Sequence, residues 1–158
     1  VSIVDKQIKD GSVLSSSIVR DLIKLGEFKK AELMLGHKWL IKGKVVEGDK
    51  RGREIGFPTA NLKTEEIIQL KFGVYAVQVN FEGKSYKGVS NYGIRPTFEG
   101  ENILLETHLF DFSEDLYGKD IIVSFVQFLR EERKFAGINS LKDQIKKDSE
   151  EALDILSK

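Results

Sequence analysis

The sequence predicts a mainly β protein, built on an antiparallel barrel or sandwich with helical segments at both ends of the chain. From Leu40 to Leu129, several segments alternate apolar and polar residues with a period of two. Glycine-containing turns such as "FEGK" and "LYGK" separate them, which leaves no room for the crossover helices that parallel strands need. The predicted strands are Leu40–Val46, Val74–Phe81, Ser85–Asn91, Leu104–Phe110 and Ile121–Leu129. A further strand is predicted to begin after Pro58.

Helical spacing predicts two short helices before the strands. Ser15 to Ser17 offer N-cap hydroxyls for the first helix, which Gly26 ends, and Gly36 ends the second. Val1 in place of methionine, and the strand-like "VSIV" that it opens, suggest that the sequence begins inside a larger protein.

A longer amphipathic helix is predicted in "NSLKDQIKKDSEEALDILSK", where Ser140 and Asp143 resemble a capping box. A single helix of this kind must lie on an apolar surface, most simply the outside of the barrel. Its apolar face is formed by Leu141, Ile145, Ala152 and Leu156.

Composition restricts the possible functions. The chain has 158 residues, of which 41% are hydrophobic, enough to bury a core. Lys and Arg total 25, and so do Asp and Glu, so no global field attracts nucleic acid or an anionic membrane. Cysteine is absent and only two histidines occur, which excludes a disulfide scaffold and argues against structural zinc. No apolar run approaches the roughly 18 residues that span a bilayer, and we expect a cytoplasmic protein.

The stretch "GDKRGREIGFPTANL", residues 48 to 62, is the first candidate for chemistry. Its glycines expose backbone amides next to Lys50, Arg51 and Arg53, a combination able to close over phosphate, although an ordinary solvated turn has the same composition. It lacks the Gly-Lys-Ser/Thr ending of a Walker motif. Pro58 would fix the direction of the chain into the next strand and place Thr59 and Asn61 on one face, where their oxygens suit a hard cation such as magnesium.

Two strand segments carry further polar residues. In "GVSNYGIRPT", residues 88 to 97, a turn is sufficient to explain Gly93 and Pro96. In "LLETHLFDF", residues 104 to 112, alternation places Glu106 and His108 on one face. Glu106 is either a solvent-facing carboxylate or a general base at a barrel mouth, whereas a lone strand histidine such as His108 is more often structural.

The last segment, "FLREERKF" at residues 128 to 135, mixes charges with flanking phenylalanines. It is either a solvated edge or a loop that covers a planar aromatic ligand, and composition leaves both alternatives open.

In this order, the segments "GREIGFPTANL", "GVSNYGIRPTF", "ETHLFDF", "DLYG" and "LREERKF" resemble the riboflavin kinase family, and the Pro-Thr-Ala-Asn element is close to diagnostic for it. The resemblance runs from about His37 to the C-terminus. It implies a closed, six-stranded, antiparallel Greek-key barrel with a C-terminal helix, and the transfer of the γ-phosphate of ATP to the 5'-hydroxyl of riboflavin, giving ADP and FMN.

The resemblance also implies residue roles. Glu106 matches the general base of the family, and Thr59 and Asn61 match the residues that reach magnesium and the phosphates. The loop that covers the flavin would bind it through Arg130, Arg133 and Phe135. The nucleotide-binding residues would be Gly52, Arg53, Gly56, Phe57, Pro58, Thr59, Asn61 and Asn91.

Upstream, "LSSSIVRDLIKLGEFKKAELMLG" resembles the end of the FMN adenylyltransferase domain found in bacterial bifunctional FAD synthetases. The expected division is therefore residues 1–36 as a remnant of that domain and residues 37–158 as the kinase domain. Because the His-x-Gly-His motif of the adenylyltransferase is absent, FAD synthesis is not expected from this chain alone.

Two other functional classes compete with a kinase. A non-catalytic barrel that binds flavin or nucleotide would need neither a base nor a pair of cation ligands. A nucleic-acid-binding barrel would need a basic stripe interleaved with exposed aromatic residues. The expected partners are thus ATP and riboflavin, with magnesium as cofactor, no nucleic acid, no membrane and a monomeric state.

Overall fold

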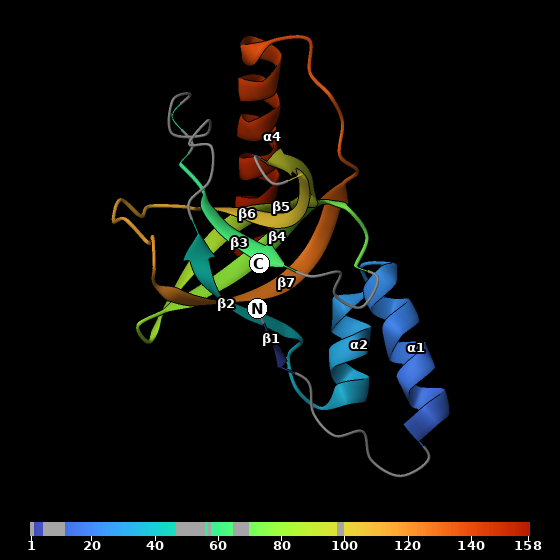
Figure 1. Ribbon diagram of the computed structural model, residues 1–158. Coiled ribbons are helices and arrows are strands. Elements are labelled where there is room, and N and C mark those ends of the chain that lie inside the picture. The colour runs from blue at the N-terminus through green and yellow to red at the C-terminus, as the bar shows by residue number, and fades with distance from the viewer. Residues whose placement is uncertain (1, 5–11, 47–55, 57, 65–69, 98–99) are drawn as a thin grey trace.

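A computed structural model describes residues 2–4, 12–46, 56, 58–64, 70–97 and 100–158 of the chain (Figure 1). The statements below concern these residues. Their elements are β1 (Ser2–Val4), α1 (Ser12–Lys24), α2 (Phe28–Leu35), β2 (Leu40–Val46), β3 (Ala60–Thr64), β4 (Gly73–Phe81), β5 (Lys84–Thr97), β6 (Gly100–Leu109), β7 (Asp120–Arg130) and α4 (Ile138–Leu156).

The strands form a closed antiparallel barrel, which decides between the barrel and the sandwich. The order around it is β2-β3-β6-β5-β4-β7, and β7 pairs again with β2 to close the ring. β6 lies between β3 and β5, so neighbours in the barrel are not always neighbours in sequence. The short β1 pairs with residues 40–42 of β2. The predicted six-stranded barrel with helices at both ends is therefore confirmed.

The hydrophobic core lies inside the barrel and continues under the N-terminal helices. Ile41, Leu62, Leu105 and Val123 come from four strands and are fully buried in one cluster. Phe28 of α2 belongs to the same cluster. The first two helices are thus packed onto the barrel, while the division of domains at residue 36 stays a prediction.

A second apolar cluster lies outside the barrel, beneath α4. Val74 and Ala76 of β4 pack there with Ala152 and Leu156 of the helix. Figure 1 shows α4 (red) standing against the barrel, away from α1 and α2 (blue). The predicted apolar face of this helix is confirmed at Ala152 and Leu156, which are buried.

Two predicted helix starts are wrong. α4 begins at Ile138 with Gly137 as N-cap and no capping side chain, so Ser140 lies inside its first turn. Similarly, Ser15 to Ser17 lie within α1, which begins at Ser12. Serine is tolerated inside helices at modest cost, so its presence alone does not mark a start.

Among the described residues, no helix is long and apolar enough to cross a membrane.

β5 is longer than predicted. The sequence predicts a turn at Gly93 and Pro96, yet the strand continues to Thr97, because β6 pairs with it from Gly88 to Thr97. Pairing with β4 ends earlier, at Tyr92. Beyond Tyr92 the strand is therefore bonded on one side only, and such a one-sided position tolerates proline.

Candidate active site

Two cavities meet at Thr59, directly before β3. The first, here named the 112–117 cavity, has a volume of about 520 Å³, and the second, the Glu106 cavity, about 870 Å³. Both fall in the range of small-molecule sites. Thr59 lines both cavities, so the two share a wall at the start of β3.

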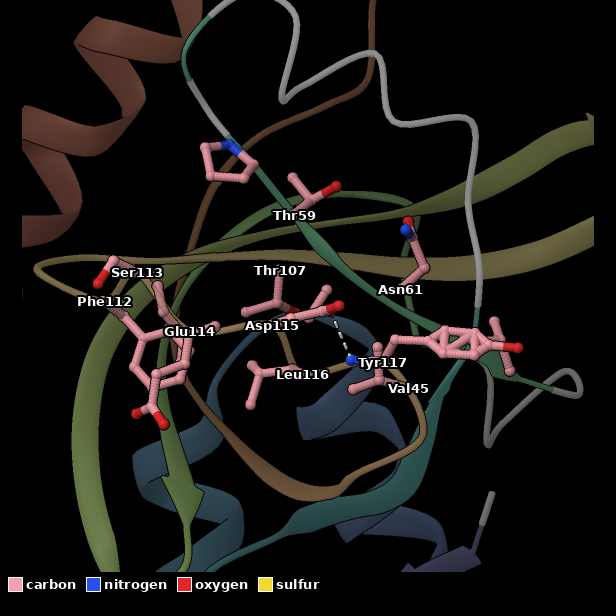
Figure 2. Close-up of a pocket in the computed structure, with 14 residues that line it drawn as sticks. Val45, Thr59, Asn61, Thr107, Phe112, Ser113, Glu114, Asp115, Leu116 and Tyr117 are labelled. Carbon is pink, nitrogen blue, oxygen red and sulfur yellow. Dashed lines mark hydrogen bonds between the residues drawn. The ribbon is translucent and has the colours of Figure 1, made fainter.

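The 112–117 cavity lies between β3 and the segment that follows β6. Phe112 anchors that segment, because its ring packs edge-on against Tyr86 at 4.9 Å between centroids. Leu116 is buried, and the backbone N–H of Tyr117 donates to Asp115 Oδ1 at 2.9 Å (Figure 2). The Tyr117 ring remains largely exposed at this cavity. An exposed aromatic ring next to carboxylate and hydroxyl groups suits a flat polar ligand.

Pro58 leads into β3 as the sequence predicts. The following residues alternate, and Figure 2 shows the side chains of Thr59 and Asn61 projecting to the same side of the strand. His108 Nδ1 lies 2.9 Å from the Pro58 carbonyl oxygen. A carbonyl only accepts, so this nitrogen carries the proton and donates. His108 therefore fixes the entry of β3, which agrees with its predicted structural role.

Asn61, Glu106 and Asn91 form a row across three neighbouring strands. Asn61 of β3 lies directly opposite Glu106 of β6, and Glu106 lies directly opposite Asn91 of β5. Opposed residues on antiparallel strands point to the same side, with Cβ atoms about 5 Å apart. Thr107, next to Glu106, points into the barrel and is fully buried. Glu106 is thus on the outer face of the barrel wall, at the Glu106 cavity, with 22% of its side chain exposed.

Arg95 bridges two carboxylates in this cavity. Its Nε donates to Glu106 Oε1 at 2.7 Å and its Nη1 to Glu132 Oε1 at 3.0 Å. Burial lowers the pKa of the Arg95 guanidinium, but Glu106 and Glu132 outweigh that effect and raise this pKa on balance. An adjacent guanidinium favours the ionised form of a carboxylate, which is the form that accepts a proton.

The opposite wall of the Glu106 cavity is formed by the end of β7, the next segment and α4. Arg130 binds Asp148 of α4 through two nitrogens, with Nη2 at 2.8 Å from Oδ2 and Nε at 3.0 Å from Oδ1. The guanidinium of Arg133 lies 5.1 Å from the centre of the Phe135 ring, within cation–π range. Arg130 is consequently bound to α4, and Arg133 is bound to the same helix through a hydrogen bond from its Nη2 to Gln144 Oε1.

The structure brings most of the predicted site residues together. Thr59, Glu106, Asn91, Arg130, Arg133 and Phe135 line the Glu106 cavity, and Pro58, Thr59 and Asn61 line the 112–117 cavity. The sequence prediction groups Asn91 with Pro58, Thr59 and Asn61 as nucleotide residues, but Asn91 lines the Glu106 cavity and not the 112–117 cavity. Gly56 is an exposed turn residue with a positive φ of 90°. Gly52, Arg53 and Phe57 lie outside the described residues.

Sequence reasoning missed Arg95, Glu132 and the residues 113–117. Arg95 is hidden in a segment that looks like a turn, and its partners come from β6 and from beyond β7. The sequence signal for a site at residues 113–117 is the acidic pair Glu114 and Asp115, which comes directly before "LYG".

No cluster of three or more acidic or histidine side chains suited to a metal occurs among the described residues. A magnesium site would instead need few protein ligands, because Mg²⁺ keeps waters and binds substrate phosphates. Thr59 and Asn61 offer two neutral oxygens on one face of β3, and Asn61 is only 7% exposed. These residues therefore fit a metal held jointly with a nucleotide.

Comparison with known proteins places this arrangement in a family. The family described as riboflavin kinase matches residues 35–156, which include both cavities. The chain belongs to the riboflavin kinase family. Its Glu106 cavity and 112–117 cavity are accordingly features of a riboflavin kinase domain.

Relatives agree with this assignment. The chain is 42% identical over 156 residues to the bifunctional riboflavin kinase/FMN adenylyltransferase of Bacillus subtilis, covering 96% of this chain and 49% of that protein. This riboflavin kinase domain thus spans about half the length of the curated relatives that it matches.

Two solved structures share the fold. A crystal structure named macrolide-efflux protein, from Streptococcus pneumoniae, is 35% identical with a TM-score of 0.76, and the match covers 89% of this chain and 47% of that one. The riboflavin kinase of Trypanosoma brucei is 23% identical with a TM-score of 0.52, covering 75% and 80%. At that identity, the second comparison supports the barrel fold alone.

Proposed function

We propose that this chain transfers the γ-phosphate of ATP to the 5'-hydroxyl of riboflavin, producing FMN and ADP. The observation that carries the proposal is the wall shared by the two cavities. Thr59 lines both, and Asn61 of the 112–117 cavity is directly opposite Glu106 of the Glu106 cavity on the paired strand. A phosphoryl group must pass from one substrate to the other, and this is the place where donor and acceptor would meet.

The nucleotide is assigned to the 112–117 cavity. The exposed ring of Tyr117 offers a stacking surface, and the cavity ends at Thr59 and Asn61. Those two oxygens would hold Mg²⁺ together with the phosphates. When bound, the ion would neutralise charge that builds up on the transferred group.

Riboflavin is assigned to the Glu106 cavity. Arg130, Arg133 and Phe135 line this cavity, and their guanidinium groups and aromatic ring would contact the isoalloxazine ring. Asn91 Oδ1 is buried and has no hydrogen-bond partner among the described residues, so a ligand hydroxyl would satisfy it. The ribityl chain would then run toward Glu106.

Glu106 would act as the general base. Its carboxylate accepts the proton of the 5'-hydroxyl as the hydroxyl oxygen forms a bond to the γ-phosphorus and the bond to the ADP oxygen breaks. Such transfers depend mainly on positioning and electrostatics, because no covalent enzyme intermediate is needed.

The test is product formation. Purified protein incubated with riboflavin, ATP and Mg²⁺ should yield FMN and ADP by chromatography, and omission of any one of the three should abolish both. Binding of flavin or nucleotide without FMN would instead identify a non-catalytic barrel. We also assign residues 1–36 to the end of an adenylyltransferase domain, so FAD should not accumulate.

A further inference from the structure

Arg95 connects two elements that are distant in sequence. It lies near the end of β5, where β6 is the strand that pairs with it among the residues the structure describes. One nitrogen binds Glu106 of β6 at 2.7 Å, and another binds Glu132, which follows β7, at 3.0 Å. All three side chains are between 22% and 29% exposed, so the cluster is shielded but open to the Glu106 cavity.

Gly93 makes room for this cluster. Gly93 and Arg95 are two positions apart on β5, so they share a face. A Cβ on Gly93 would overlap the Glu132 carboxylate. The backbone of Gly93 is not in the left-handed region, so alanine would not strain it. Space rather than backbone conformation therefore requires glycine at this position.

The neighbouring glutamate has a different partner. Glu131 pairs with Lys71 at 3.2 Å, and its side chain is 74% exposed. Of the two adjacent carboxylates, Glu132 lines the cavity and Glu131 does not. The connection to Arg95 is thus specific to one residue of this segment.

We propose that Arg95 is a positioning residue that couples the placement of residues 132–137 over the flavin to the orientation of Glu106. This inference rests on the proposed function, because it takes Glu106 as the base. Residues 132–137 line the cavity assigned to riboflavin. When this segment is in place over the cavity, the Glu132 carboxylate accepts from Arg95 Nη1. Arg95 Nε then donates to the Glu106 carboxylate and holds it in one orientation. A guanidinium suits this role because its donors are fixed in a plane.

A double-mutant cycle measures the coupling. Arg95→Gln should lower kcat about 10- to 100-fold, in line with the cost of misplacing a reacting group. Glu132→Gln should lower kcat by about 3- to 10-fold, and the double variant should be no slower than Arg95→Gln alone. The KM for ATP should remain unchanged throughout. Glu131→Gln is the matched control and should behave like the wild type.

Two further variants separate positioning from folding. Arg95→Lys keeps the charge but loses the fork, so kcat should be only partly restored relative to Arg95→Gln. Gly93→Ala keeps all three charged groups and displaces only the Glu132 carboxylate, so it should reproduce the effect of Glu132→Gln. Thermal melting of each variant verifies that it is folded.

Amide hydrogen exchange tests the structural half without any substrate. Residues 132–137 should exchange faster in Arg95→Gln and Gly93→Ala than in the wild type or Glu131→Gln. Unchanged exchange in Arg95→Gln would overturn the link. Additive effects of Arg95→Gln and Glu132→Gln on kcat would overturn the coupling. A raised KM for ATP would also overturn it, and would indicate that Arg95 binds a phosphate of the nucleotide. If the wild type forms no FMN, the proposed function and the role of Arg95 in catalysis are both refuted. The hydrogen-exchange result would still decide whether Arg95 holds residues 132–137 in place.

Discussion

Glu106 and Asn61 are opposed residues on neighbouring strands, and the proposed function gives them separate tasks. Glu106 is to take a proton from the acceptor hydroxyl, and Asn61 is to hold the metal with the nucleotide. Their substitutions should therefore have different kinetic signatures, although the two side chains are adjacent.

Glu106→Gln should reduce turnover by about 10² to 10⁴, because the amide has no basic oxygen to accept the proton. Its carbonyl oxygen still accepts from Arg95, so riboflavin and nucleotide affinities should be largely retained. Steady-state kinetics and fluorescence titration with riboflavin measure the two effects. Glu101→Gln, an exposed position on the same strand, is the control. Turnover equal to the wild type would refute the base assignment.

Asn61→Ala should weaken the binding of magnesium-ATP by about 10- to 100-fold, because it removes one of the two protein oxygens assigned to the ion, and a lost polar contact with a charged group has an effect of this order. Isothermal titration calorimetry with ATP and Mg²⁺ measures this affinity. Asn80→Ala, at an exposed strand position of β4, should leave it unchanged. An unaltered affinity in the Asn61 variant would argue against metal binding at β3.

Strand alternation was enough to place Glu106 with His108 and Thr59 with Asn61, since both pairs depend only on the local period of two. The pairing of Asn61 with Glu106 depends on the register between β3 and β6, which local pattern does not contain. Arg95 was missed for the same reason. Its role depends on the extension of β5 and on a carboxylate that follows β7, and both are tertiary features.

Among the elements, α4 packs on the barrel through an apolar cluster and is also bound to the end of β7 by an ion pair. Asp148 is buried to 5% exposure of its side chain and binds Arg130 at the end of β7. Gln144 of the same helix also donates to Asp148 Oδ1 at 2.9 Å. This polar contact orients the helix along one wall of the Glu106 cavity.

Asp148→Asn should destabilise the protein, because it leaves a partly buried guanidinium without its charge partner. Breaking a buried pair costs about 3–5 kcal/mol, and the partial exposure of Arg130 reduces our expectation to about 2–3 kcal/mol. Urea denaturation should show a lower midpoint with an unchanged slope. Asp154→Asn, on the same helix, removes an exposed pair with Lys158 beyond the helix end and should cost less than about 1 kcal/mol. Equal costs for the two variants would contradict this account.

For the whole molecule, the N-terminal helices are part of the hydrophobic core. Phe28 of α2 is 2% exposed and its ring lies 5.6 Å from Phe125 and 6.0 Å from Trp39, between centroids. The barrel itself was predictable, because period-two segments with short turns leave few other arrangements. The packing of α2 was not, since the helical spacing gives an apolar face but not the surface that it covers.

Phe28→Ala should lower the free energy of unfolding by about 3–5 kcal/mol, as expected for the loss of a buried aromatic ring. Thermal or urea unfolding, followed through Trp39 fluorescence, measures the change. Leu33→Ala on the same helix is the control, because Leu33 is 82% exposed and its truncation should stay within about 0.5 kcal/mol. A small effect at Phe28 would mean that the helices and the barrel unfold independently.

The shared wall at Thr59 has a consequence for how the enzyme meets its ligands. Under the proposed assignment of nucleotide and flavin to the two cavities, Thr59 would contact both ligands, so the two should not bind independently. Thermodynamic linkage then requires that bound flavin changes the affinity for nucleotide by the same factor as bound nucleotide changes the affinity for flavin. A single threonine would thereby make each ligand sensitive to the presence of the other.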